Sequence, residues 1–128
     1  MKTNSLALVA VMMLLVACTT VYRAVVTLTQ VVDSAAVEYA RLYNDGLVPT
    51  ELATRVAAAH LNFRVAAGIA RDALVAYKNG TAPSPEQYNV AFTAAQQTAR
   101  DFVGLVTPLL PPHQSIALQQ RLREANEP

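Results

Sequence analysis

The chain has 128 residues, a length that suits one domain with a single hydrophobic core. Its ten Lys and Arg residues nearly balance nine Asp and Glu residues. This balance excludes a strong overall electrostatic potential that would attract nucleic acid or a strongly charged substrate. The single cysteine excludes an internal disulfide.

Residues 1–17 have the pattern of a secretory signal peptide. Lys2 supplies a positive charge before the apolar run of residues 6–17, which ends on a small residue. A transmembrane helix needs about 20 apolar residues to cross a hydrocarbon core of about 30 Å. The run is shorter than that and no stop-transfer charges follow it, so the pattern favours a cleaved signal over a permanent span.

The only cysteine ends this apolar run, in the sequence Leu15-Val16-Ala17-Cys18. The four residues resemble the lipobox of bacterial prolipoproteins. The resemblance implies diacylglyceryl transfer to the Cys18 sulfur, cleavage after Ala17, and acylation of the new amino terminus with a chain such as palmitate. In the proteobacterial pattern an aspartate after the cysteine retains the protein in the inner membrane, so Thr19 implies the periplasmic face of the outer membrane instead. The competing interpretation is a buried free cysteine.

A first helix is expected over residues 20–45. Its apolar residues recur at alternating steps of four and three, which is one stripe of an α-helix: Val21, Val25, Leu28, Val32, Ala35, Tyr39 and Leu42. Gly46 supplies a C-terminal stop. Residues 21–32 also alternate as a strand would, but no second segment offers a strand partner, so the pattern favours a helix.

A second helix is expected over residues 51–79, with Thr50 as its N-cap and Asn79-Gly80 as its stop. One apolar seam comprises Leu52, Val56, Ala59, Phe63, Ala66, Ala70, Leu74 and Tyr77. A second apolar strip lies on another side of the helix and comprises Ala57, Leu61, Val65, Gly68 and Val75. If the second strip stays exposed, it predicts a docking surface centred on Leu61 and Val65.

A third helix is expected over residues 85–107. Ser84 is the expected N-cap, Pro85 the first helical residue, and Gln87 completes a capping box. The seam of this helix comprises Tyr88, Phe92, Ala95, Ala99, Phe102, Val106 and Leu109. Pro111-Pro112 marks a break after it.

The expected architecture is all-α, with the three helices forming an up-down-up antiparallel bundle within residues 18–112. Alanines in the facing seams imply that the second and third helices approach closely. Residues 113–128 are expected to be a polar tail outside the bundle. Its few apolar residues, Ile116, Leu118 and Leu122, are too thin a pattern to decide whether it forms a short helix.

A row of cations is expected along the second helix. At about 100° per residue, four of them fall within about 40° of one another: His60, Arg64, Arg71 and Lys78. They predict a contact with anionic headgroups, lipopolysaccharide or an acidic partner. The competing interpretation is an ordinary solvated face. The four span about 27 Å of helix, so they do not converge on one anion.

Residues that carry chemistry are sparse in this chain. His60 and His113 are the only histidines, and neither has a cysteine or paired carboxylate at ligand spacing, so no metal site is expected. The sequence contains no phosphate-binding loop, no G-x-G-x-x-G motif and no nucleophile in a recognisable strained turn. We therefore expect no catalytic residues, no cofactor and no enzyme activity.

The sequence by itself names no biochemical activity. It favours a lipid-anchored helical protein of the bacterial envelope with a structural or protein-interaction role, through self-association or a helical protein partner. One alternative is a binder of a small apolar ligand or an envelope polymer, although alanine-rich seams leave little room for a cavity between the helices. Another is a phage or mobile-element lipoprotein that modifies the host envelope.

Overall fold

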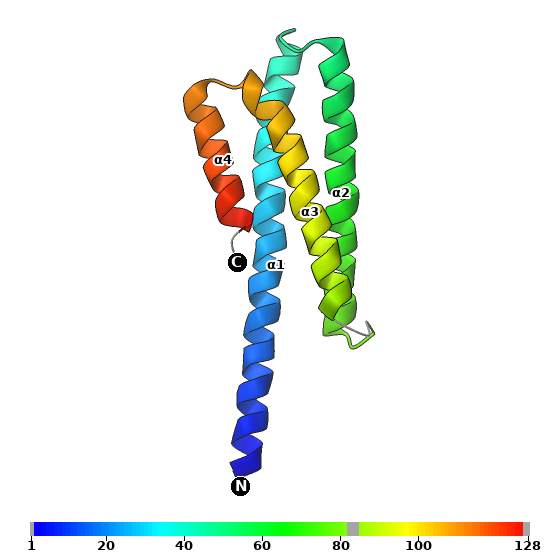
Figure 1. Cartoon of the computed structure of the whole chain (residues 1–128), viewed down its shortest axis with the longest axis vertical. Helices are drawn as coiled ribbons and strands as arrows, with labels where there is room; N and C mark the ends of the chain where they lie inside the picture. The colour runs from blue at the N-terminus through cyan, green and yellow to red at the C-terminus, as the bar shows by residue number, and fades with distance from the viewer. Residues whose placement is uncertain (1, 82–84, 127–128) are drawn as a thin grey trace.

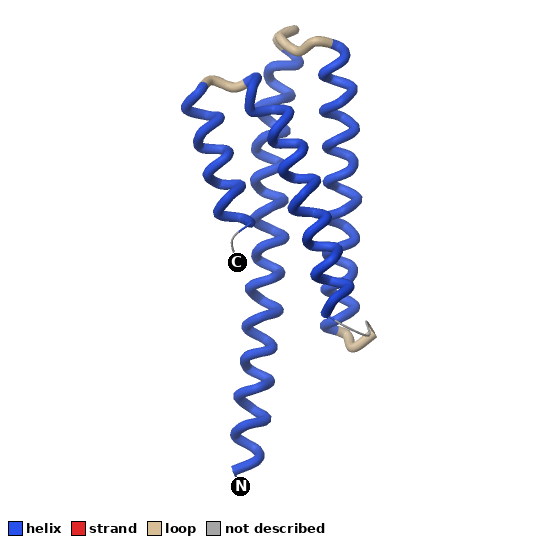
Figure 2. The backbone as a smooth tube through the Cα atoms, in the orientation of Figure 1, coloured by secondary structure: helices blue, strands red, loops and turns tan. Residues whose placement is uncertain are grey.

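The structure, a computed structural model, describes the backbone of residues 2–81 and 85–126 and the side chains of residues 23–81 and 86–126. These residues form four α-helices: α1 (Lys2–Asn44), α2 (Thr50–Lys78), α3 (Pro85–Val106) and α4 (Pro112–Asn126). A turn of 3-10 helix, Thr107–Leu109, leads from α3 towards α4. Helices and loops account for the whole described backbone (Figure 2), which confirms the all-α prediction.

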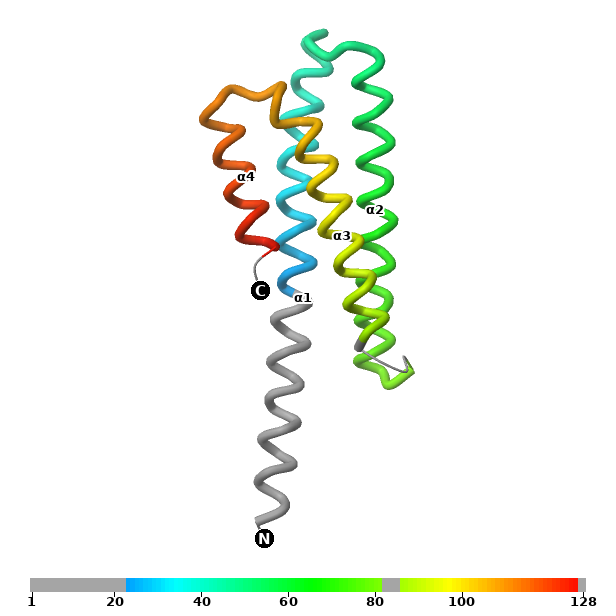
Figure 3. The backbone as a smooth tube through the Cα atoms, viewed as in Figure 1, coloured from blue at the N-terminus to red at the C-terminus, as the bar shows by residue number. Residues whose placement is uncertain are grey.

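Consecutive helices run in opposite directions, and α2 and α3 lie side by side (Figure 1). These two helices form the most extensive interface among the described elements. The fourth helix packs on α1 and α3, and its end lies beside α1 (Figure 3). The prediction of a three-helix bundle was therefore incomplete, because a fourth helix belongs to the same packed unit.

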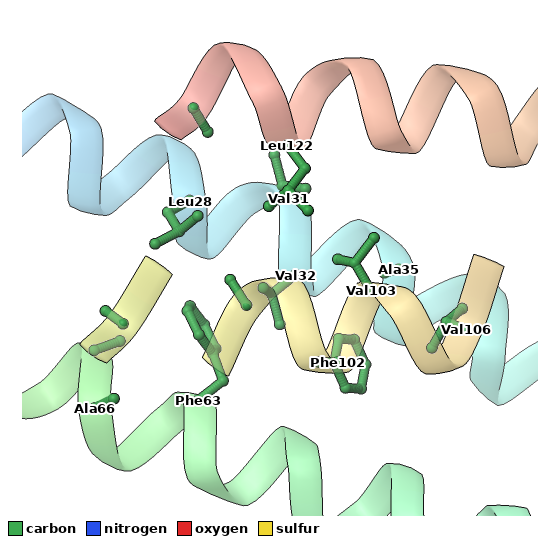
Figure 4. Packing of buried hydrophobic residues seen from close by; sticks show 14 of the residues in the cluster. Leu28, Val31, Val32, Ala35, Phe63, Ala66, Phe102, Val103, Val106 and Leu122 are labelled. Carbon is green, nitrogen blue, oxygen red and sulfur yellow. The ribbon is translucent and has the colours of Figure 1, made fainter. Parts of the chain in front are cut away.

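The placement of residues 113–128 outside the bundle was wrong, since most of them form α4. Leu118, Leu122 and Ala125 are buried at steps of four and three along this helix. Leu122 lies against Val31 of α1 (Figure 4), whereas Ile116 is 61% exposed. Three buried residues are sufficient to hold α4 in place because two helices, α1 and α3, cover them. Packing of this kind supplies most of the stability of a short helix.

One hydrophobic core connects all four helices (Figure 4). The predicted seams are confirmed where side chains are described, since their members are buried or partly buried. Small residues line the contact between α2 and α3, where Ala70, Ala95 and Ala99 have no exposed surface. The largest fully buried side chains are Phe102, Leu28, Val25, Val32, Val56, Val103 and Val106.

Both predicted glycine stops are confirmed. Gly46 and Gly80 have φ angles of 75° and 72°, the left-handed conformation in which helices commonly end. The Leu47 amide donates to the Leu42 carbonyl at 3.0 Å, and the Gly46 amide donates to the Tyr43 carbonyl at 3.0 Å. At the end of α2 the Gly80 amide donates to the Tyr77 carbonyl, and the Thr81 amide donates to the Ala76 carbonyl. The two glycines therefore end α1 and α2 with the same Schellman geometry.

The predicted cap at the start of α2 was wrong by one residue. Pro49 occupies the N-cap position with φ −61° and ψ 146°, and its side chain makes no capping hydrogen bond. Because the proline holds this extended conformation, Thr50 is the first helical residue. The third helix begins at Pro85 as predicted. The capping role predicted for Ser84 lies outside the described residues.

Gly46→Ala is expected to lower the free energy of unfolding by about 1–2 kcal/mol, because an L side chain disfavours the left-handed conformation. A methyl group at this position would meet no neighbouring atom, so conformational strain is the only expected cause. Gly68→Ala is the matched control, since Gly68 lies inside α2 and also faces open space. This control should stabilise the protein by about 0.5–1 kcal/mol. Urea unfolding measures both changes, and equal destabilisation would contradict the explanation.

Candidate functional site

A strip of exposed apolar side chains runs along α2. Leu61, Val65 and Ile69 are 62%, 54% and 56% exposed, although all three are large aliphatic residues. They are spaced four residues apart and therefore follow one another along the helix surface. We call these three residues the docking strip. The exposure of Leu61 and Val65 meets the condition for the predicted docking surface, and docking itself stays a prediction.

The docking strip borders a shallow groove between α2 and α3, with a volume of about 260 Å³. Ala66 lies at the α2 side of this groove, and Ala91 and Ala94 form the α3 side. These methyl groups are much smaller than the leucine and isoleucine beside them, so the surface is hollowed there. Asn62 is the one polar residue among those lining the groove in the described structure. The groove is therefore suited to the apolar side chains of a partner.

The sequence pattern found Leu61 and Val65 but missed Ile69. The predicted strip continued through Gly68 and Val75, whereas the groove brings Ile69 together with the first two residues. Its spacing of four residues from Val65 was the available sequence signal. The contribution of Ala91 and Ala94 had no such signal, because only tertiary packing places α3 beside α2.

The four cations predicted along α2 have two kinds of surroundings. Arg64, Arg71 and Lys78 are exposed and lie seven residues apart, so they form one row, which we call the basic row. His60 is only partly exposed, and its ring centroid lies 5.2 Å from that of Phe102 on α3. Packing between α2 and α3 explains His60 better than contact with an anion. The basic row therefore consists of three residues, of which only Arg64 lies within one helical turn of the docking strip, three residues after Leu61.

Within the described residues, no group of three His, Cys, Asp or Glu side chains is placed to hold a metal ion. No helix in the searched part of the chain combines the length and the hydropathy needed to cross a membrane. The lipobox, including Cys18, lies outside the residues whose side chains are described. No protein-family model, no curated protein and no solved structure matches this chain.

Proposed function

We propose that this protein is a lipid-anchored, non-enzymatic helical protein of the bacterial envelope that acts by binding a partner protein. The observation that supports the anchor is the sequence Leu15-Val16-Ala17-Cys18 at the end of a signal-like apolar run. Lipid on the Cys18 sulfur and on the new amino terminus supplies several acyl chains, and each buried CH₂ group contributes about 0.8 kcal/mol to membrane binding. Thr19 favours the periplasmic face of the outer membrane.

The docking strip is the proposed contact surface. Burying an exposed Val, Leu or Ile side chain contributes roughly 1.5–3 kcal/mol, which is gained only when a partner covers the strip. Side chains spaced by one helical turn beside an apolar groove match the way an amphipathic helix binds, with its own apolar residues inserted between them. The groove beside Leu61, Val65 and Ile69 provides that geometry.

Arg64 supplies a positive charge next to the docking strip. Arg64 lies three residues after Leu61, which is about one helical turn. Arg71 and Lys78 follow Arg64 at successive steps of seven residues. A partner helix with acidic residues beside its apolar face places opposite charges next to Arg64. Two copies anchored in one leaflet pair in parallel, which brings Arg64 near Arg64 of the second copy. Like charges oppose that pairing, so an acidic amphipathic helix of another protein is favoured over self-association.

Leu61→Glu combined with Val65→Glu is expected to abolish partner binding while the protein stays folded, because both side chains are already exposed. A photo-reactive amino acid at Asn62 in the full-length chain reports contact in intact cells by forming a covalent adduct. Ile116→Glu is the matched control, since Ile116 is 61% exposed on α4 and lies outside the groove. The adduct should disappear with the double variant and persist with the control.

Charge reversal in the basic row tests the chemistry of the partner. Arg64→Glu with Arg71→Glu should weaken the same adduct, because the acidic partner then meets like charge. An adduct that contains two copies of this chain would refute the heterologous partner. An adduct that survives Leu61→Glu with Val65→Glu would refute the docking strip, provided that circular dichroism shows unchanged helix content.

A further inference from the structure

A second concave surface lies between α1 and α4, and it shares no residue with the docking strip. Its larger cavity has a volume of about 430 Å³ and is continuous in its lining with a smaller cavity of about 230 Å³, because both are lined by Ser34 and Arg121. We call the two together the α1–α4 groove. Its larger part has the size of a small-molecule site, for which roughly 300–1,000 Å³ is typical.

The α1–α4 groove has an apolar base. Ala35 from α1 and Leu118 from α4 line the larger cavity and are almost completely buried, and Leu110 closes the end near the α3–α4 connection. Val37 adds an aliphatic wall and is 61% exposed, so it is available to a ligand. An apolar base with a few polar groups around it is the usual composition of a ligand site.

Arg121 is the cation of this groove and lines both cavities. Two carboxylates also line the groove, and each already has a partner on its own helix. The Glu38 carboxylate lies 3.5 Å from the Arg41 guanidinium, and the Glu124 carboxylate accepts a hydrogen bond from the Gln120 amide at 3.2 Å. Among the described residues, the Arg121 side chain makes no ion pair or hydrogen bond, so its guanidinium N–H donors are available to a ligand.

We infer that the α1–α4 groove binds a small apolar monocarboxylate, with its carboxylate on the Arg121 guanidinium and its apolar body over Val37 and Leu118. A planar guanidinium matches a carboxylate through two parallel hydrogen bonds. The Ser34 hydroxyl, which lines both cavities, is placed to add a further donor. A single negative charge is favoured over a dianionic phosphate, because Glu38 and Glu124 repel additional negative charge.

Three probes with one carbon skeleton test this assignment: phenylbutanoate, phenylbutanol and phenylbutylamine. Isothermal titration calorimetry on the full-length protein in a neutral detergent measures their dissociation constants, with detergent alone as the blank. We expect phenylbutanoate to bind at least about tenfold more tightly than the other two, which corresponds to one charge-assisted interaction. Equal binding of all three probes, tighter binding of the amine, or no binding of phenylbutanoate would each overturn the inference.

Two variants and one control test whether the probe binds in the α1–α4 groove. Arg121→Ala should weaken phenylbutanoate binding about tenfold to a hundredfold and leave phenylbutanol unchanged. Arg123→Ala is the matched control, because Arg123 is an exposed arginine on the same helix that lines neither cavity. Ala117→Leu fills the larger cavity from an exposed position and should abolish binding of phenylbutanoate. Equal effects of the two arginine variants, or full binding in Ala117→Leu, would show that the probe binds elsewhere.

Inorganic phosphate separates the two anion chemistries. The inferred site should release phenylbutanoate only at phosphate concentrations far above those of the carboxylate probe. Competition by phosphate at equal concentration would overturn the assignment of a monocarboxylate.

Discussion

Phe63→Ala is expected to lower the free energy of unfolding by about 3–5 kcal/mol. The Phe63 side chain is only 2% exposed and extends from α2 into the core towards α3 (Figure 4). Many core residues on the facing helix are alanines, such as Ala95 and Ala99. Their short side chains cannot extend into the vacated space. The substitution therefore leaves a cavity and loses the burial of the ring. Domains are typically stable by about 5–15 kcal/mol, so this loss is a large part of the total.

Urea unfolding followed by circular dichroism measures the effect of Phe63→Ala. Val65→Ala is the control, because Val65 lies two residues further along the same helix and is 54% exposed. Truncation of this exposed side chain should change the free energy of unfolding by no more than about 0.5 kcal/mol. A Phe63→Ala variant as stable as the control would contradict the core position of the ring.

Cys18→Ala is expected to abolish association with the membrane, because the proposed lipid attaches to the sulfur that this substitution removes. The core that the described side chains form begins at Val25, so we expect the helix content and the free energy of unfolding to stay unchanged. Single acyl chains give only marginal binding, whereas several chains hold a protein firmly. Loss of the modification therefore converts firm attachment to none, which makes this the largest expected functional effect.

Membrane fractionation and intact-mass spectrometry test the proposed anchor. The wild-type chain should begin at Cys18 and carry the mass of a diacylglyceryl group and an amide-linked acyl chain. Cys18→Ser is a close control, because the hydroxyl is nearly isosteric with the thiol but lacks the sulfur that receives the lipid. This variant should lose the membrane as Cys18→Ala does. Retention of residues 1–17 in the mature wild-type protein, or an unmodified Cys18 in the membrane fraction, would refute the processing that the lipobox implies.

Local sequence patterns predicted most of α1, α2 and α3. Each of these helices has a long seam of apolar residues at steps of four and three, and the burial of Val32, Val56 and Phe102 follows from that spacing. The stops at Gly46 and Gly80 were also readable, because a glycine in the left-handed conformation satisfies the last carbonyls of its own helix. These features depend on neighbours within a few residues along the chain, which is why the sequence alone determined them.

Only the tertiary structure decided the place of α4 and the composition of the two candidate sites. The stripe of Leu118, Leu122 and Ala125 becomes stabilising only where α1 and α3 lie ready to cover it. His60 and Ile69 both lie on α2, yet one packs against Phe102 while the other stays exposed. The spacing within α2 indicates an apolar strip, but whether a neighbouring helix covers that strip depends on where distant segments pack.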